Sequence, residues 1–191
     1  MRRAVGSSLI ELIVLLGVTA AVVTAVAPEW VSWRQSYRLQ AATRHVALTI
    51  AAVQTRAAVE GVGYGLRFRG TATSAYWELI RDGDGDGIRA GDVRSGVDAV
   101  LRDVAIADGF PGIGVGAPGT ASSLSGGVAP ADGIAFGVSD TLSIRPEGST
   151  TSGTLYLYNG LGEGGAVRIY GPTGRVSIWR FGAERGSWQQ R

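Results

Sequence analysis

Hydrophobic and polar residues follow three patterns along the chain. From Leu9 to Ala27 the only charged residue is Glu11, and this run is close to the roughly 20 residues that a membrane-spanning helix needs. From Arg34 to Glu60, apolar residues recur every three or four positions, which predicts an amphipathic helix. The residues of this apolar stripe are Leu39, Ala42, Val46, Ile50, Val53 and Ala57. Gly61 and Gly63 predict the end of the helix.

Beyond Gly63 the hydrophobic period shortens to two, which predicts strands separated by Gly, Pro, Asn or Asp turns. The predicted strands are residues 64–68, 76–80, 133–136, 141–144, 153–158, 166–170 and 174–179. The Gly, Ala, Ser and Pro-rich stretch 108–132 predicts a long loop. We therefore expect an α+β fold, in which a long N-terminal helix with a membrane-spanning first half packs on an antiparallel β-sheet domain.

Composition narrows the chemistry that the chain can perform. Its 191 residues include no Cys and no Lys, so disulfides, thiol catalysis, zinc-thiolate sites, a Schiff-base lysine and a Walker-type phosphate loop are excluded. The only histidine, His45, has no acid or nucleophile at an informative spacing, so we interpret it as a packed or surface helix residue. These absences predict that the protein is not an enzyme.

The N-terminal apolar run has three interpretations. A cleaved secretory signal fits the basic start and Ala25-Val26-Ala27, but Pro28 would directly follow the cut and Glu11 would interrupt the apolar region. A plain membrane anchor also leaves Glu11 unexplained. A specialised anchor, in which the carboxylate has a function, is the third interpretation, and an ionisable group in such a segment is by default a functional hypothesis.

The residues around Glu11 favour the specialised anchor. Gly6-Ser7-Ser8-Leu9-Ile10-Glu11-Leu12 resembles the processing signal of type IV pilins and type II secretion pseudopilins, in which glycine ends a short basic leader and glutamate stands fifth after it. The resemblance implies that a prepilin peptidase cleaves between Gly6 and Ser7 and that Ser7 is then methylated.

This resemblance also implies a role for Glu11 in assembly. Cleavage leaves a cationic amine on Ser7, and the Glu11 carboxylate can pair with the amine of a neighbouring subunit in a filament, since an unpaired buried charge is costly. An ion pair within one subunit is the alternative.

The C-terminal strand pattern is similar to the end of the GspH/FimT family. The similar segments are Gly153-Thr154-Leu155-Tyr156-Leu157, Ala166-Val167-Arg168-Ile169 and Gly174-Arg175-Val176. The resemblance implies a minor pseudopilin at or near the tip of a type II secretion pseudopilus, supporting assembly and protein secretion. Its implied partners are other major and minor pseudopilins, the prepilin peptidase, the inner membrane and secreted substrates.

The same resemblance implies a division of the chain and a location. The parts are a leader (1–6), a transmembrane N-terminal helix (7–28), the soluble half of the long helix (29–60) and a β-rich globular domain (61–191). The expected location is the bacterial inner membrane, with a single pass, a cytoplasmic N-terminus and a periplasmic globular domain. Arg2 and Arg3 agree with this orientation by the positive-inside bias.

The stretch Asp82-Gly83-Asp84-Gly85-Asp86-Gly87 partly matches a calcium-binding loop. Hard oxygen ligands are present, but Val93 replaces the glutamate expected at the twelfth position and Asp92 falls one residue early. A weak calcium site using Asp82, Asp84, Asp86 and Asp92 and a solvated turn both remain open; apart from this possibility we expect no cofactor. A secreted calcium-binding β domain is the corresponding alternative class of protein.

The stretch from Gly160 to Gly165 formally satisfies the dinucleotide-binding pattern G-x-G-x-x-G. A strand pattern follows it, whereas the dinucleotide fingerprint must open a helix. We therefore predict a hairpin loop.

Charge is unevenly distributed between two regions. Residues 78–108 hold eight acids and four Arg, whereas residues 164–191 hold five Arg and one Glu. Arg175, Arg180 and Arg185 lie in the basic region among aromatic residues, a composition suited to DNA or to a partner subunit. The alternative function is therefore a FimT-like minor type IV pilin that binds DNA for natural transformation; a solvated face is the simplest interpretation.

Overall fold

The computed structural model describes the chain except residues 1–7, 70–74, 107–108, 120 and 183–185, and except the side chains of 25–29, 31, 104–105 and 138. The chain divides into two compact units, Met1–Arg34 and Gln35–Arg191, and each is described by itself. The expected leader, 1–6, lies outside the described residues, and so do Gly6 and Ser7.

The first unit contains the N-terminal part of helix α1, which runs from Leu9 to Glu60. Ser8 precedes the helix, and its Oγ accepts a hydrogen bond from the Glu11 backbone N–H at 3.3 Å. Ser8 and Glu11 thus have the spacing of a capping box, in which a Ser at the N-cap bonds the backbone three residues later. The Ser8 hydroxyl therefore caps the first turn of the helix through the Glu11 backbone N–H.

Among the described residues, no helix combines the length and the apolar content that crossing a bilayer requires. The apolar stretch of α1 whose side chains are described ends at Thr24 and is shorter than the roughly 20 residues of a spanning helix. The expected membrane-spanning first half of the helix is therefore wrong, and with it the fold class that included it. The expected single-pass inner-membrane location is wrong for the same reason.

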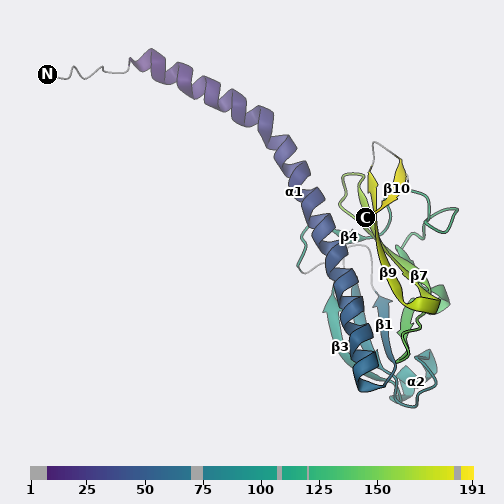
Figure 1. Ribbon diagram of the computed structural model, residues 1–191. Helices are drawn as coiled ribbons and strands as arrows, with labels where there is room; N and C mark the ends of the chain where they lie inside the picture. The colour runs from purple at the N-terminus through teal and green to yellow at the C-terminus, as the bar shows by residue number, and fades with distance from the viewer. Residues whose placement is uncertain (1–7, 70–74, 107–108, 120, 183–185) are drawn as a thin grey trace. The chain divides into compact units, whose positions relative to one another are not determined.

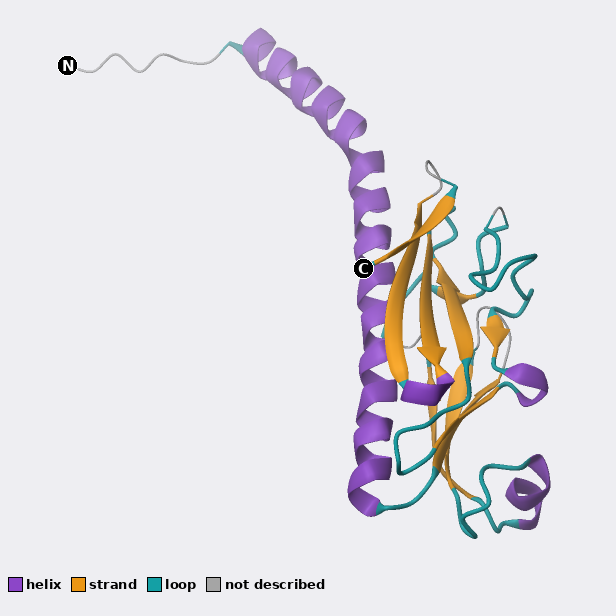
Figure 2. Ribbon diagram, turned by 45° about the vertical axis from the view of Figure 1, so that its right-hand side comes forward, coloured by secondary structure: helices purple, strands orange, loops and turns teal. Residues whose placement is uncertain are grey.

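The second unit contains the remainder of α1, two antiparallel sheets and a short helix, α2 (Ala90–Ser95). The stripe Leu39, Ala42, Val46, Ile50, Val53 and Ala57 is buried, as its spacing predicts. The helix ends where Gly61 adopts the left-handed conformation, with φ of 66°, and the Gly61 N–H donates to the Ala57 carbonyl. Figures 1 and 2 show this part of α1 running alongside the strands.

The first sheet has four strands in the order β3-β2-β1-β6. They are β1 (Tyr64–Arg69), β2 (Tyr76–Arg81), β3 (Ala99–Ala105) and β6 (Thr141–Ile144). The second sheet has the order β10-β9-β8-β7-β4, and β5 also pairs with β7. Its strands are β4 (Gly114–Val115), β5 (Ile134–Ala135), β7 (Gly153–Tyr158), β8 (Gly164–Tyr170), β9 (Arg175–Gly182) and β10 (Ser187–Gln190).

All seven predicted strands are present, although β5 is only two residues long. Strands β3, β4 and β10 and helix α2 were not predicted. Strand β3 is an edge strand whose Val100 and Leu101 are exposed, so its pattern lacks the alternation that burial of one face imposes. Strand β4 lies within the predicted loop 108–132. It is a strand because Gly114 and Val115 pair with Tyr158 and Leu157 of β7, and not because of a local strand pattern.

One core joins the second half of α1 to both sheets. Its largest fully buried side chains include Phe68 of β1, Leu142 of β6 and Leu155 of β7. Phe68 stacks on Phe136, with ring centroids 5.1 Å apart. The helix therefore bridges the two sheets and positions the loops between β7, β8 and β9 beside it.

Candidate functional site

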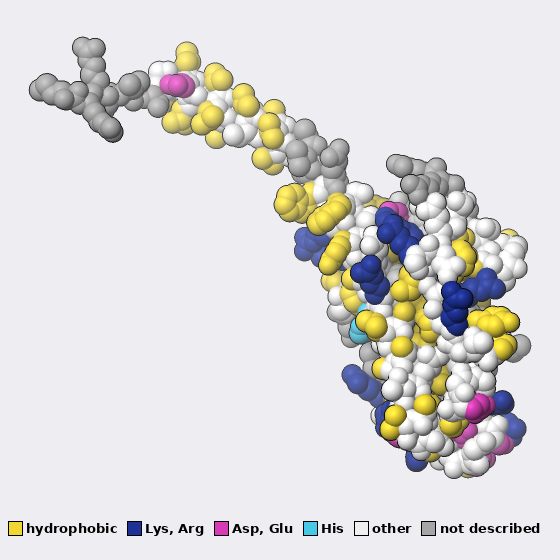
Figure 3. Space-filling model, viewed as in Figure 1, with side chains coloured by type: hydrophobic (Ala, Val, Ile, Leu, Met, Phe, Trp, Pro, Cys, Tyr) yellow, Lys and Arg dark blue, Asp and Glu magenta, His cyan; other side chains and the backbone are white. Residues whose placement is uncertain are grey.

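The described apolar side chains at the start of α1 are almost all exposed. They include Leu9, Ile10, Leu12, Ile13, Val14, Leu15, Leu16, Val18, Val22 and Val23, each more than half exposed. Figure 3 shows these hydrophobic side chains along the N-terminal part of the helix. An apolar patch of this extent is typical of an interaction surface, and a helix that is apolar on all sides is normally buried.

Glu11 is the only charged residue among the described side chains from Leu9 to Thr24, and it is exposed. The structure therefore places a carboxylate within the apolar interaction surface, one turn from the start of the helix. The side chain on which the predicted modification falls, Ser7, lies outside the described residues, as does the predicted cleavage site after Gly6.

The Asp/Gly stretch forms a loop after β2 whose carboxylates accept hydrogen bonds from the backbone. Asp82 accepts from the N–H groups of Gly85 and Gly87 at 2.7 and 3.0 Å. Asp98, which the sequence analysis did not select, accepts from the N–H groups of Gly83 and Arg89 at 3.1 and 3.2 Å. Both carboxylates are buried, with Asp98 only 1% exposed, so they organise the loop from within.

Two groups of acids in this loop have carboxylate oxygens within 4.8 Å of one another. They are Asp82, Asp84 and Asp98, and Asp84, Asp86 and Asp92. Desolvation raises the pKa of Asp86, and repulsion from Asp84 adds to this although the Arg89 guanidinium is nearby. Three of the predicted ligands, Asp82, Asp84 and Asp86, thus lie in the loop, and the fourth, Asp92, lies on α2. Asp82 and Asp98 already accept backbone N–H groups, so a turn without metal is sufficient to explain them.

The predicted basic residues are not brought together. Arg175 and Arg180 are five positions apart on β9, so their side chains point to opposite faces of the sheet, and Arg185 lies outside the described residues. Arg180 instead donates to Glu163 at 2.7 Å, beside a pocket that it shares with Arg44 and Arg191. Sequence reasoning missed Arg44 because it lies on α1, far from the C-terminal basic region.

Glu163 lies at the centre of a polar cluster between α1 and the loop that joins β7 to β8. Its carboxylate accepts hydrogen bonds from Ser36, Asn159 and Arg180. Burial alone would raise the pKa of Glu163, but the hydrogen bonds from Ser36 and Arg180 and the charge of Arg180 outweigh it, so the pKa is lowered. The Gly160–Gly165 stretch is confirmed as part of a hairpin, because β7 and β8 pair antiparallel on either side of it.

His45 packs against aromatic rings, with ring centroids 6.3 Å from Trp77 and 5.6 Å from Phe110. His45 is also exposed, which agrees with its interpretation as a packed or surface helix residue.

Comparison with known proteins gives no relative for this chain: no family model matches it, and neither the curated proteins nor the solved structures include a significant match.

Proposed function

We propose that the protein is a minor pseudopilin, a structural subunit whose N-terminal helix packs among the helices of other pseudopilin subunits. The observation that carries this proposal is the exposure of the apolar side chains from Leu9 to Val23, with Glu11 as the one charge among them. A position at or near the tip of a type II secretion pseudopilus, with a role in protein secretion, follows only from the sequence resemblance.

The hydrophobic effect supports assembly through this helix. Full burial of one Leu, Ile or Val side chain is worth about 1.5 to 3 kcal/mol. Ten such side chains between Leu9 and Val23 are more than half exposed in the single chain. Packing against helices of neighbouring subunits therefore has a large driving force. The loss of translational, rotational and side-chain freedom on association reduces this free energy.

Glu11 makes the proposed packing selective. Processing after Gly6 creates an amine on Ser7, and a carboxylate buried among apolar helices is strongly penalised unless it finds a cation. Pairing between the Glu11 carboxylate of one subunit and the Ser7 amine of another would favour one register of neighbouring helices over those that leave both charges unpaired.

Mass spectrometry of the mature N-terminus tests the proposed processing. We expect the mature chain to start at Ser7 and to carry a methyl group there. A start at Pro28 would identify the apolar run as an ordinary secretory signal and would overturn the proposal.

Substitutions at Glu11 separate its charge from its place in the capping box. Gln is compatible with a capping box, so Glu11→Gln removes the charge and retains the local helix start, whereas Ser8→Ala removes the cap and retains the charge. We expect Glu11→Gln to be processed normally but to enter filaments poorly, as measured by co-sedimentation with sheared filaments, and Ser8→Ala to assemble. Normal assembly of Glu11→Gln would show that the charge is not needed.

DNA binding stays the alternative prediction. The separation of Arg175 from Arg180 removes one argument for it, since the two side chains cannot contact the same strand of nucleic acid from one face. Salt-sensitive retention of DNA, lost in Arg180→Gln, would favour it over the structural subunit.

A further inference from the structure

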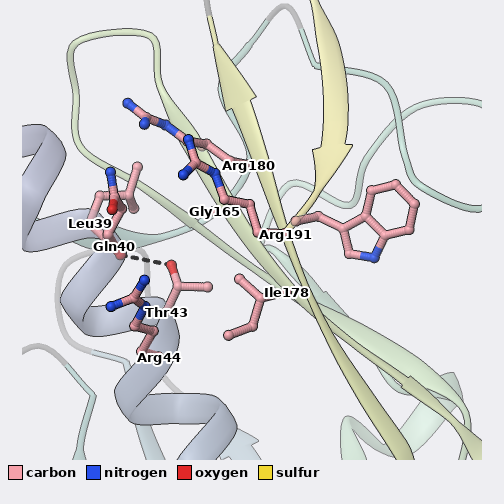
Figure 4. A pocket seen from close by; sticks show the side chains of 10 residues that line it. Leu39, Gln40, Thr43, Arg44, Gly165, Ile178, Arg180 and Arg191 are labelled. Atoms are coloured by element: carbon pink, nitrogen blue, oxygen red, sulfur yellow. Dashed lines mark hydrogen bonds between the residues drawn. The ribbon is translucent and has the colours of Figure 1, made fainter.

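A pocket of about 260 Å³ lies between α1 and the six-stranded sheet, entirely within the second unit. Leu39, Gln40, Thr43 and Arg44 of α1 line one side, and the other side is formed by β8, β9 and the residue that follows β10. The lining residues on that second side are Gly164, Gly165, Ile178, Trp179, Arg180 and Arg191. In Figure 4, Arg180 and Arg191 lie next to each other across the pocket from Arg44.

One wall of the pocket forms where Thr43 of α1 packs on Gly165 of β8. Gly165 pairs directly with Arg180, and Val167 pairs with Ile178, so these four residues share the face of the sheet that points to α1. A Cβ atom on Gly165 would stand 2.3 Å from the Thr43 Oγ1, so the absence of a side chain there makes room for Thr43 and lets the helix approach the sheet. Thr43 closes the pocket from the helix side, where its hydroxyl donates to the Leu39 carbonyl at 2.7 Å.

The pocket carries more positive charge than the protein itself neutralises. Arg180 pairs with Glu163 at 2.7 Å, and its side chain is 29% exposed. Within the described part of the chain, the guanidinium groups of Arg44 and Arg191 pair with no carboxylate. Two guanidinium groups therefore face the pocket without an acidic partner, and guanidinium matches the geometry of carboxylate and phosphate oxygens.

Apart from the three Arg residues, Gln40 and Thr43, the lining is apolar or glycine: Leu39, Ile178, Trp179, Gly164 and Gly165. A bare ion such as inorganic phosphate would leave this surface unused. The size is near the lower end of small-molecule sites, which are typically about 300 to 1,000 Å³. The fitting ligand thus has an anionic head and a compact apolar body, about the size of a substituted benzene ring.

We propose that this pocket binds a small organic oxyanion, with its carboxylate or phosphate held by Arg44, Arg180 and Arg191 and its apolar body against Leu39 and Ile178. Neither assembly through the N-terminal helix nor its processing is needed for this binding, so the two proposals stand or fall separately.

Isothermal titration calorimetry of the full chain with three probes tests the two halves of the ligand. Phenyl phosphate has both the oxyanion and the apolar body, inorganic phosphate lacks the body, and benzyl alcohol lacks the charge. We expect phenyl phosphate to bind at least about tenfold more tightly than either, and its affinity to fall as salt is raised. Equal affinity for benzyl alcohol, or no heat of binding with millimolar phenyl phosphate, would overturn the proposal.

Two variants and a matched control locate the binding. Arg44 lies on the exposed side of α1, so Arg44→Gln should not unfold the protein. This variant should bind phenyl phosphate at least about fivefold more weakly. Ile178→Thr should lower the preference for phenyl phosphate over inorganic phosphate. Arg175→Gln removes an exposed arginine from the same strand as Arg180, outside the pocket, and should change nothing.

Unchanged binding in Arg44→Gln would place the ligand elsewhere and refute the site. Analytical ultracentrifugation tests whether the pocket is instead a contact between copies of the chain. Self-association that Arg44→Gln abolishes, without binding of phenyl phosphate, would identify the pocket as a contact between copies of the chain and would also overturn the proposal.

Discussion

Thr43 of α1 lies directly over Gly165 of β8, so close that a Cβ atom on residue 165 would stand 2.3 Å from the Thr43 Oγ1. A side chain at position 165 therefore requires the Thr43 side chain, or the helix that carries it, to shift. This contact brings the helix close to the sheet beside the pocket that Thr43, Gly165 and Arg180 line.

Gly165→Ala should therefore destabilise the protein. Overpacking of this kind typically costs about 1 to 3 kcal/mol, and we expect a loss of that size in the free energy of unfolding, measured by urea denaturation. Gly182→Ala is the matched control, because Gly182 lies on the neighbouring strand β9 and a Cβ there meets no atom within 4 Å. Equal effects of the two substitutions would contradict the close packing of Thr43 on Gly165.

The ion pair between Arg67 of β1 and Glu78 of β2 should contribute to the stability of the four-stranded sheet. The two residues are cross-strand neighbours, their side chains are only 13% and 14% exposed, and Arg69 also donates to Glu78 at 3.2 Å. Glu78→Gln leaves two guanidinium groups without their anion, so we expect a loss of about 2 kcal/mol in the free energy of unfolding.

Arg69→Gln provides the comparison, since the Arg69 side chain is 49% exposed and its pair with Glu78 is screened by water. We expect its effect to be well under half that of Glu78→Gln. The reverse order of the two losses would show that the Arg67–Glu78 pair is not the stabilising one.

Glu163 should make stability depend on pH in the acid range. Its pKa is lowered in the folded protein, so its contribution is fully present above the ordinary glutamate pKa of about 4.3 and is lost as the pH falls through the lower pKa of the folded state. The difference in unfolding free energy between the wild type and Glu163→Gln should be largest near neutral pH and should shrink below about pH 4. A difference independent of pH would argue against the ion pair with Arg180.

Asp98 should be essential to the loop after β2, whereas Asp84 should not. Asp98→Ala leaves the N–H groups of Gly83 and Arg89 without their acceptor in a buried place, at a cost of about 1 to 3 kcal/mol. Asp84→Ala removes an exposed carboxylate and should change the melting temperature little in the absence of metal.

Repeating both measurements in millimolar calcium tests the weak site, since a bound ion would raise the melting temperature of the wild type more than that of Asp84→Ala. An equal response of the two proteins would exclude Asp84 as a ligand.

Much of the fold could be predicted because local patterns there agree with burial. The six apolar residues from Leu39 to Ala57 recur at helical spacing, and all six are buried. The central strands β1, β7 and β8 are mostly buried, and their apolar and aromatic residues stand between glycine-containing turns, which is a strand pattern that sequence reveals. The edge strands β3 and β10 and the short strand β4 escaped prediction, because pairing with a neighbour and not their own pattern holds them in place.

The candidate sites also contain features that the sequence shows and features that only the tertiary structure shows. The sequence by itself determined the apolar run with Glu11, the acids after β2 and the absence of Cys and Lys, because these are properties of residue types and spacing along one segment. Only the tertiary structure decided that Asp98 joins the acidic loop, that β9 extends far enough for Arg175 and Arg180 to face apart, and that Arg44 and Arg180 line one pocket. The place of Asp98 depends on its hydrogen bonds to the Gly83 and Arg89 N–H groups, and the pocket depends on the packing of α1 against β8 and β9. These residues are far apart in the sequence, so no local pattern reveals either outcome.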